Sequence, residues 1–290
     1  MPILNRDIVD YYNTHQIFYT YFWSRTALHY GFWYDDTKNL AEAVRNTDKF
    51  VIEQLQINSV DIVLDAGCGV GGTAIYIAES TGAKVWGITL SNIQQNIARK
   101  KAFKSKAANL LKFSIQDYTK TNFEHDTFSK VFGIEGICHC SSKMDFLKEA
   151  YRIIKPGGKI AVIDGFLMKA NLDQREQKIY QKSCEGWVLA NLAGKEQFRQ
   201  FLEEAGFKNI TYTDMLKNIK RSSQRLYLWG LLMYPVSFLF SKIGITRENL
   251  SSFYQKALFD GICTYGVFVA EKPLSPTSVH IGNSIGEKIY

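Results

Sequence analysis

Short apolar runs alternate with segments of helical periodicity along most of the chain. Five runs predict strands, at residues 61–66, 83–89, 111–116, 128–134 and 159–164. The other segments repeat their apolar positions every three or four residues and predict helices at 40–55, 72–80, 91–105 and 142–154. Because strand and helix alternate at this spacing, we expect an α/β fold with a parallel, doubly wound, Rossmann-like sheet.

The two ends of the chain depart from this alternation. Residues 5–34 are crowded with aromatic side chains, which make up only 14% of the whole chain, and their spacing predicts one or two helices. We expect residues 1–40 to form an aromatic lid, to pack as core against the sheet, or to do both. After the fifth strand, 174–205 predicts helix and 207–214 and 261–271 predict two closing strands, whereas 273–290 has no periodicity and predicts a disordered tail.

The first predicted strand runs into a glycine-rich turn. From residue 65 the sequence is Asp-Ala-Gly-Cys-Gly-Val-Gly-Gly, and a predicted helix follows at once. Glycine lets the backbone bend sharply and lets a ligand approach closely, while the free N–H groups of the turn and the helix start face that ligand. A tight loop without a ligand would carry the same glycines, so the turn alone decides nothing.

Three further segments give this turn its meaning. Val-Trp-Gly-Ile-Thr-Leu-Ser at 85–91 is followed by Gln94, Asp117 closes the third strand, and Lys-Pro-Gly-Gly at 155–158 leads into the fifth. Together with Asp-x-Gly-x-Gly they resemble the class I S-adenosylmethionine-dependent methyltransferases over roughly residues 5–272. The resemblance implies one domain over residues 1–272, with a seven-stranded sheet that is mostly parallel, a closing antiparallel hairpin and helical cap segments.

The resemblance also implies which residues hold S-adenosylmethionine. Gly67 and Gly69 would admit the methionine and ribose portion, and Asp65 would order that end. Most members have an acid for the ribose hydroxyls at the end of the second strand, but Thr89 stands there, and in the sterol, tocopherol and cyclopropane-lipid relatives a Leu-Ser-x-x-Gln segment lies nearby. The expected cofactor-binding residues are Asp65, Gly67, Cys68, Gly69, Thr89, Leu90, Ser91, Gln94, Gln116 and Asp117, the last as the acceptor for the adenine amino group.

The acceptor side is predicted from two other resemblances. Glu135 and His139 follow the fourth strand and resemble the Glu-x-x-x-His of the sterol-type enzymes, so either could act as a general base if the acceptor loses a proton. His139 could instead be a helix-start residue bonded to the backbone. The segment 29–33 resembles the His-x-Gly-x-Trp stretch of sterol and tocopherol relatives. The expected substrate pocket contains Tyr19, His29, Tyr30, Trp33 and Trp187, whose aromatic faces can stabilise a sulfonium or a carbocation.

A cap insertion is predicted at 216–258. Four cations, Lys217, Lys220, Arg221 and Arg225, precede an apolar stretch at 226–240 that Pro235 interrupts. Fifteen apolar-dominated residues fall short of the roughly 20 that cross a bilayer. A basic collar before an aromatic-rich apolar segment fits a substrate cap or a peripheral membrane contact through 217–240, and a buried helix hairpin fits equally well.

Composition limits the partners, the cellular location and the metal binding that we expect. The net charge of +7 allows an anionic partner, but there is no nucleic-acid recognition motif or arginine-rich run, so we expect no nucleic acid. Five cysteines without framework spacing, and a start without an apolar signal region, predict free thiols and a cytoplasmic location. Cys138-x-Cys140 lacks a second ligand pair, so we expect no metal.

These observations predict a methyltransferase that transfers the methyl group of S-adenosylmethionine in line to a lipophilic small molecule, such as an isoprenoid, a sterol-like compound or a quinol. Two alternatives remain open. The chain could modify lipid chains like the cyclopropane synthases, although Gly-Val-Gly at 69–71 replaces their Gly-Trp-Gly. It could also be a cofactor-binding module without transferase activity. The identity of the methylated atom, the number of methyl groups and a homodimer are left open.

Overall fold

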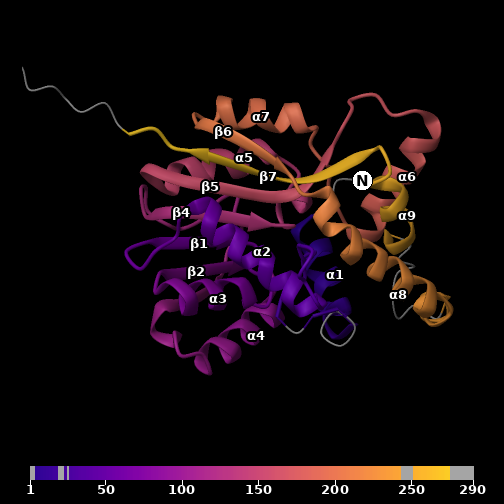
Figure 1. The fold of residues 1–290 in the computed structure, drawn as a ribbon, viewed down its shortest axis with the longest axis horizontal. Coiled ribbons are helices and arrows are strands. Elements are labelled where there is room, and N and C mark those ends of the chain that lie inside the picture. Colours follow the sequence, from indigo (N-terminus) through magenta and orange to yellow (C-terminus); the bar gives the residue numbers. More distant parts are fainter. Residues whose placement is uncertain (1–3, 19–22, 25, 243–250, 275–290) are drawn as a thin grey trace, which may run out of the picture.

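One seven-stranded sheet organises the protein. The computed structural model describes residues 4–18, 23, 24, 26–242 and 251–274. Strand order is β3-β2-β1-β4-β5-β7-β6, as Figure 1 shows. The strands are β1 (Ile62–Ala66), β2 (Lys84–Thr89), β3 (Leu111–Ile115), β4 (Phe128–Ile134), β5 (Ile154–Leu167), β6 (Lys208–Asp214) and β7 (Cys263–Glu271).

The sheet is parallel on one side and antiparallel on the other. β1 pairs in parallel with β2 and β4, β2 with β3, and β4 with β5. β7 lies antiparallel between β5 and β6. The predicted fold class is therefore confirmed, including the closing hairpin. β5 begins earlier than predicted, because Ile154 already pairs with Phe128 before the ladder shifts its register and the chain turns through Gly157.

Helices cover both faces of the sheet. The helices are α1 (Asn5–Phe18), α2 (Leu40–Leu55), α3 (Gly72–Thr81), α4 (Asn92–Phe103), α5 (Lys143–Ile153), α6 (Gln174–Trp187), α7 (Lys195–Glu204), α8 (Leu216–Lys242) and α9 (Ser251–Leu258). Apolar residues of α2, α3, α4 and the start of α8 share one buried cluster with the sheet. Those of α5 and α7 share another. The helices thus form two layers around a buried sheet, as a doubly wound fold requires.

Local sequence explains why these helices start and which face they bury. Ser142 accepts a hydrogen bond from the N–H of Asp145 and so caps the first turn of α5. Along α5 the residues Phe146, Ala150 and Ile153 recur at helical spacing and are buried. The amphipathic pattern therefore places this helix against the sheet.

The cap differs from its prediction in one respect. Pro235 was expected to interrupt the apolar stretch, but α8 continues through it to Lys242. Proline removes one N–H donor and crowds the carbonyl one turn earlier, which a helix tolerates better where water reaches the backbone, and Pro235 is exposed. Among the described helices, none combines the length and apolar character needed to cross a membrane. Residues 243–250 of the predicted cap and 275–290 of the predicted tail lie outside the described residues.

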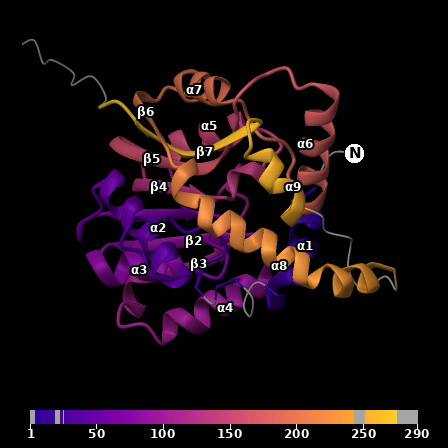
Figure 2. The same ribbon diagram turned by 45° about the vertical axis from the view of Figure 1, so that its right-hand side comes forward.

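Four helices gather at one end of the sheet. Figure 1 and Figure 2, which differ by a turn of the molecule, both place α1, α6, α8 and α9 together at the end where the parallel strands finish. The segment that follows α1 joins them, since the N–H of Trp33 donates to the carbonyl of Asn218 in α8 at 2.9 Å. The amino-terminal segment and the cap therefore meet over the predicted site.

Candidate active site

A cavity opens at the carboxyl ends of the parallel strands. Its lining comes from the β1–α3 and β2–α4 turns, from the end of β4, from α1 and residues 26–30, and from α8 and α9. The expected site residues that line it are His29, Tyr30, Asp65, Gly67, Cys68, Gly69, Thr89, Leu90, Ser91, Gln94, Gln116, Glu135, His139 and Trp187. The fold thus brings together expected site residues as distant in the sequence as His29 and Trp187.

Two expected residues lie outside the lining, and a third is not among the described residues. Trp33 is outside the lining; its ring N–H donates to Ser222 Oγ at 2.9 Å. Asp117 is also outside it, and its carboxylate accepts hydrogen bonds from Asn5 at 2.7 Å and from Thr119. Tyr19 lies outside the described residues. The proposed pocket role of Trp33 and the adenine role of Asp117 therefore stay predictions without support from the geometry.

The glycine turn leaves room beside its backbone. Gly67 has φ +96° and Gly69 has φ +50°, both in the left-handed region that favours glycine. A Cβ atom built on either residue would have no neighbour closer than 3.8 Å. Gly72 is different, since a Cβ there would fall 1.9 Å from the carbonyl oxygen of Thr26, which crosses the helix start. The turn is thus open towards the cavity and closed by the amino-terminal segment behind it.

Asp65 has an unsatisfied carboxylate oxygen. Its Oδ2 is buried and has no hydrogen-bond partner among the described residues. Burial raises the pKa of Asp65 to about 8; the positive charge of protonated His29 opposes the rise, and the negative charge of Asp48 adds to it. A buried carboxylate without a partner is costly, and a bound cation would remove that cost. The orphaned oxygen and the open glycine turn fit a ligand with an ammonium group, as the methionine end of S-adenosylmethionine has.

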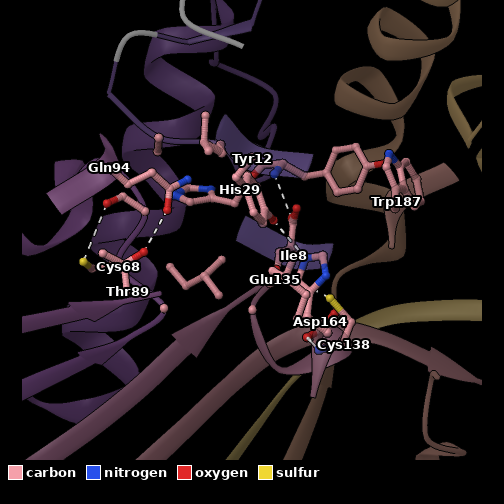
Figure 3. Close-up of a pocket in the computed structure, with 18 of the residues that line it drawn as sticks. Ile8, Tyr12, His29, Cys68, Thr89, Gln94, Glu135, Cys138, Asp164 and Trp187 are labelled. Carbon is pink, nitrogen blue, oxygen red and sulfur yellow. Dashed lines mark hydrogen bonds between the residues drawn. The ribbon is translucent and has the colours of Figure 1, made fainter. Parts of the chain in front are cut away.

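The Leu-Ser-x-x-Gln residues are held by the protein itself. Thr89 Oγ1 donates to Gln94 Oε1 at 2.9 Å, and Ser91 Oγ accepts from the N–H of Gln94, capping α4. Ser91 Oγ also donates to Asn13 Oδ1 of α1 at 2.6 Å. In Figure 3 Thr89 and Gln94 lie together with Cys68 on one side of the cavity. These side chains therefore anchor α1, in addition to any contact with ribose.

Glu135 occupies a strained backbone position at the end of β4. It has φ +49°, which a non-glycine residue rarely adopts outside functional sites and turns. Its Oε1 accepts from the N–H of Tyr30 at 2.8 Å and from the hydroxyl of Tyr265 at 2.7 Å. Burial raises the pKa of Glu135 to about 7, although His29 and the two hydrogen bonds act against the rise. The side chain therefore titrates close to neutral pH.

His139 is held in one tautomer. Its Nδ1 lies 3.0 Å from the carbonyl oxygen of Val188, which can only accept, so Nδ1 carries the proton. Nε2 is then an acceptor, and the hydroxyl of Tyr12, 2.9 Å away, donates to it. Burial lowers the pKa of His139 to about 4, with the Val188 contact opposing the fall and the charge of Lys143 adding to it. His139 is therefore a neutral imidazole whose lone pair is occupied.

His29 belongs to a buried charged network. Its Nε2 lies 3.7 Å from Asp48, which also accepts from Thr73 at 2.7 Å and from Arg45 at 2.9 Å. Burial disfavours the charged imidazole, but the hydrogen bond and charge of Asp48, with the charge of Glu135, outweigh it and raise the pKa of His29. When His29 is protonated, its positive charge opposes the rise in the pKa of Asp65 and of Glu135.

Sequence reasoning missed several lining residues with polar groups, among them Tyr12, Asp164 and Tyr265. Tyr12 belongs to α1, Asp164 ends the predicted fifth strand, and Tyr265 lies on the antiparallel strand β7. Figure 3 shows Tyr12 beside Trp187, on the opposite side of Glu135 from Cys68 and Gln94. The position at a strand's carboxyl end could have identified Asp164. No sequence signal identifies the contacts of Tyr12 and Tyr265.

The lid segment and the cap are joined by a buried glutamine. Gln255 of α9 is fully buried, and its Oε1 accepts from the hydroxyls of Tyr30 at 2.8 Å and Ser223 at 2.9 Å. Its Nε2 donates to the carbonyl of Ser223 at 2.7 Å. Tyr30 is thus hydrogen-bonded to a residue that links α8 and α9, and both helices lie more than 180 residues further along the sequence. Gln255 lies outside the cavity lining, but Tyr30, which it holds, belongs to that lining.

Known proteins share both the sequence and the fold. A family model described as mycolic acid cyclopropane synthetase matches residues 4–221. The sterol 24-C-methyltransferase of Saccharomyces cerevisiae is 30% identical over 72% of this chain, which spans 55% of that enzyme's length. The tocopherol O-methyltransferase of Arabidopsis thaliana is 25% identical over 93% of this chain and 83% of that protein.

The fold also occurs with a different chemistry. The crystal structure of the [4+2]-cyclase SpnF has a TM-score of 0.78 and 18% identity, and the match covers 95% of this chain and 98% of that one. At this identity the likeness shows the fold alone. Function must therefore be argued from the site.

Proposed function

This chain belongs to the mycolic acid cyclopropane synthetase family, and from that membership we propose that it is an S-adenosylmethionine-dependent methyltransferase that acts on a lipophilic small molecule. The observation that carries the proposal is one cavity lined both by an open glycine turn with the unpaired carboxylate oxygen of Asp65 and by aromatic side chains. In Figure 3 Tyr12 and Trp187 lie on the opposite side of this cavity from Cys68, Thr89 and Gln94. Fold likeness alone would not distinguish a transferase from other enzymes of this shape.

The cofactor end is formed by contiguous motifs. Asp65, Gly67 and Gly69 would hold the methionine portion, and Thr89, Ser91, Gln94 and Gln116 line the cavity where the nucleoside would lie. When bound, S-adenosylmethionine supplies an electrophilic methyl group on a sulfonium. Holding the two reactants in line is the main contribution of the protein, and orientation can be worth up to about 7–11 kcal/mol.

The acceptor end has one base suited to neutral pH. With a pKa of about 7, Glu135 is ionised in a large fraction of molecules, and its carboxylate can take a proton from an acceptor hydroxyl. His139, with a pKa of about 4 and its Nε2 occupied by Tyr12, takes a proton far less readily. We therefore propose that Glu135 removes the proton from the acceptor and that His139 orients the Tyr12 hydroxyl.

The acceptor class follows from the lining. The rings of Tyr11, Tyr12, Trp23, Tyr30, Tyr118, Trp187, Phe259 and Tyr265 contribute to the cavity. Aromatic surface of this extent favours a lipophilic acceptor and can stabilise positive charge next to it. An isoprenoid, a sterol-like compound or a quinol meets these conditions. The relatives named above methylate sterols or tocopherol, according to their names.

The remaining proposals concern surroundings and partners. All five cysteines are free, which supports a cytoplasmic location. We propose a peripheral membrane contact through residues 217–240 and keep a homodimer as an alternative use of that surface.

Labelled S-adenosylmethionine tests the activity. The purified full-length chain is incubated with fractionated lipid extract, and we expect label in one lipophilic product and none with the Gly69→Val variant. Methylation of an alkene followed by ring closure also adds one carbon, so the product is identified by NMR rather than by mass. A cyclopropane ring would assign the chain to lipid-chain modification, and absence of labelled product from every fraction would contradict the proposal.

A further inference from the structure

One side of α8 changes from basic to apolar along its length. The exposed positions of this helix recur every three or four residues and so form a single stripe, which we call the α8 stripe. Its first half contains Lys217, Lys220, Arg221, Gln224 and Arg225, and its second half contains Leu228, Leu231, Leu232, Pro235, Phe238 and Leu239. The helix contains no aspartate or glutamate. Leu232 is 70% exposed and Leu239 is 59% exposed, which is unusual for leucine.

The apolar half of the α8 stripe projects beyond the sheet. Figure 2 shows the second half of α8 extending away from the body of the protein, with α9 above the middle of α8 in that view. The two helices touch closely at Gly230, where a Cβ atom would fall 2.2 Å from Ser252 Oγ. Tyr227 and Tyr234 pack edge to face on Phe253 of α9. The inner side of the helix is therefore packed, and its outer leucines face outwards.

Cations flank the apolar half as they do at a membrane interface. Lys242 lies 5.1 Å from the ring centre of Phe238, and Lys256 lies 5.1 Å from that of Tyr227. Long basic side chains that lie along apolar surface keep their charge in the headgroup layer while the apolar groups enter the acyl boundary. A second copy of the chain would fit this surface less well. If two α8 helices faced each other, the cations of one would find no carboxylate on the other, because α8 contains neither aspartate nor glutamate.

The same two helices line the cavity. Leu226 of α8, Leu258 of α9 and the adjoining Phe259 belong to its lining, and Leu226 precedes the exposed Leu228 by two residues. An acceptor leaving a lipid layer at the α8 stripe would therefore reach the cavity past two helices. The family match ends at residue 221, before the apolar half begins, so family membership does not predict this surface.

We propose that the α8 stripe docks this protein on an anionic lipid surface and that the lipophilic acceptor enters the cavity from that surface. The proposal rests on the proposed function for the nature of the acceptor. Docking itself needs no turnover. The basic half would bind anionic headgroups, and the leucines and Phe238 would enter the acyl boundary.

Vesicle sedimentation tests the docking. The full-length protein is mixed with vesicles of phosphatidylcholine alone or with added phosphatidylserine, and we expect sedimentation with the anionic vesicles that weakens at high salt. Lys217, Lys220 and Arg225 are changed together to Gln, leaving Arg221, which stacks on Trp33 at 5.6 Å. Three cations removed from the surface should weaken partitioning by at least about 100-fold.

A matched variant separates the stripe from net charge. Lys100, Lys104 and Lys106 are exposed in or just after α4, and changing these three to Gln removes the same charge elsewhere. We expect that variant to partition within about a few-fold of the natural chain, since headgroup attraction falls off within a Debye length. Leu231→Gln with Leu232→Gln should weaken binding even at low salt. Affinity for S-adenosylhomocysteine should be unchanged in all three variants, which shows that each is folded.

Three results would overturn the proposal. These are no sedimentation of the natural chain at low salt, equal loss in the α4 and α8 triple variants, or a dimer in light scattering that the leucine variant dissociates. The last result would assign the stripe to a second copy.

Turnover with detergent-dispersed acceptor should be the same in the α8 triple variant and the natural chain, whereas turnover with acceptor in anionic vesicles should fall in the variant. Absence of turnover in both assays, with sedimentation intact, would contradict the proposed function and leave docking standing.

Discussion

The two ends of the cavity differ in how far apart in the sequence their residues lie. The cofactor end comes from short contiguous turns, such as Asp65 to Gly69, that follow neighbouring parallel strands. The acceptor end comes from α1, residues 26–30, α8 and α9, and its contacts join Tyr30 to Gln255 and Tyr12 to His139. Backbone geometry therefore determines the first end, while tertiary hydrogen bonds determine the second. Substitutions should affect the two ends separately.

The largest effect is expected at Glu135. Glu135→Gln removes the base but keeps the oxygen that accepts from Tyr30 and Tyr265, so turnover should fall about 10²–10⁴-fold while affinity for S-adenosylhomocysteine is retained. In the natural chain kcat should rise with pH as the carboxylate forms around pH 7, and the variant should lose that rise. His139→Ala should keep it. An unchanged pH profile in Glu135→Gln would remove this residue from proton transfer.

The cofactor end should fail most completely at Gly69. Valine there places a branched side chain in the open space of the turn at φ +50°, and affinity for S-adenosylhomocysteine in calorimetry should fall by at least about 100-fold. Gly82→Val is the matched control, because Gly82 also has positive φ, +75°, but lies outside the cavity lining. It should lower stability and leave affinity alone. Equal losses in both variants would mean that backbone strain, not the cavity, explains the effect.

Asp65 links the cofactor end to pH. Because its pKa is raised to about 8 in the folded protein, the folded state holds this proton more tightly than the unfolded state, and stability falls as pH rises from about 4 to about 8. The slope is at most about 1.4 kcal/mol per pH unit for this group. Asp65→Asn should flatten the fall in melting temperature between pH 5 and pH 8, measured by calorimetry of the free protein, and weaken cofactor binding. Parallel melting curves would show that Asp65 is not the group concerned.

Gln255 should act on the acceptor end alone. Leucine there removes the oxygen that accepts from the Tyr30 hydroxyl, and loss of this hydrogen bond should cost about 1–3 kcal/mol of free energy. We expect kcat/KM for the acceptor to fall about tenfold or more, with affinity for S-adenosylhomocysteine within about twofold. Gln200→Leu makes the same change at an exposed position of α7, away from the α8 stripe, and should alter neither. A weakened cofactor affinity in Gln255→Leu would show that the two ends are coupled.

The smallest effect is expected at Asp117. Its carboxylate is outside the lining and is already bonded to Asn5 and Thr119, so Asp117→Ala should change affinity for S-adenosylhomocysteine by less than about tenfold. A larger loss of affinity in calorimetry would show that Asp117 contacts the adenine and belongs to the cofactor end.

The strands and the cofactor turns could be predicted because their signals are local. Apolar runs and periodic segments predicted the alternation, and the acid and glycines at 65–69 predicted a glycine-rich turn, whose cofactor role came from the resemblance to class I methyltransferases. The contacts of Tyr12, Tyr265 and Gln255 could not be predicted, since nothing in their own neighbourhood selects their partners. The helix through Pro235 was missed for a related reason, because exposure of that position, which makes the proline tolerable, is a property of the folded chain.

The contact between Tyr30 and Gln255 sets an order of assembly on the ribosome. Gln255 is synthesised 225 residues after Tyr30, a delay of roughly 10–45 seconds at ordinary rates of translation. Throughout that time this contact cannot form, whereas the glycine turn and strands β1 to β6 are all synthesised before Gln255 is reached. The cofactor end is therefore synthesised before the acceptor end can be completed.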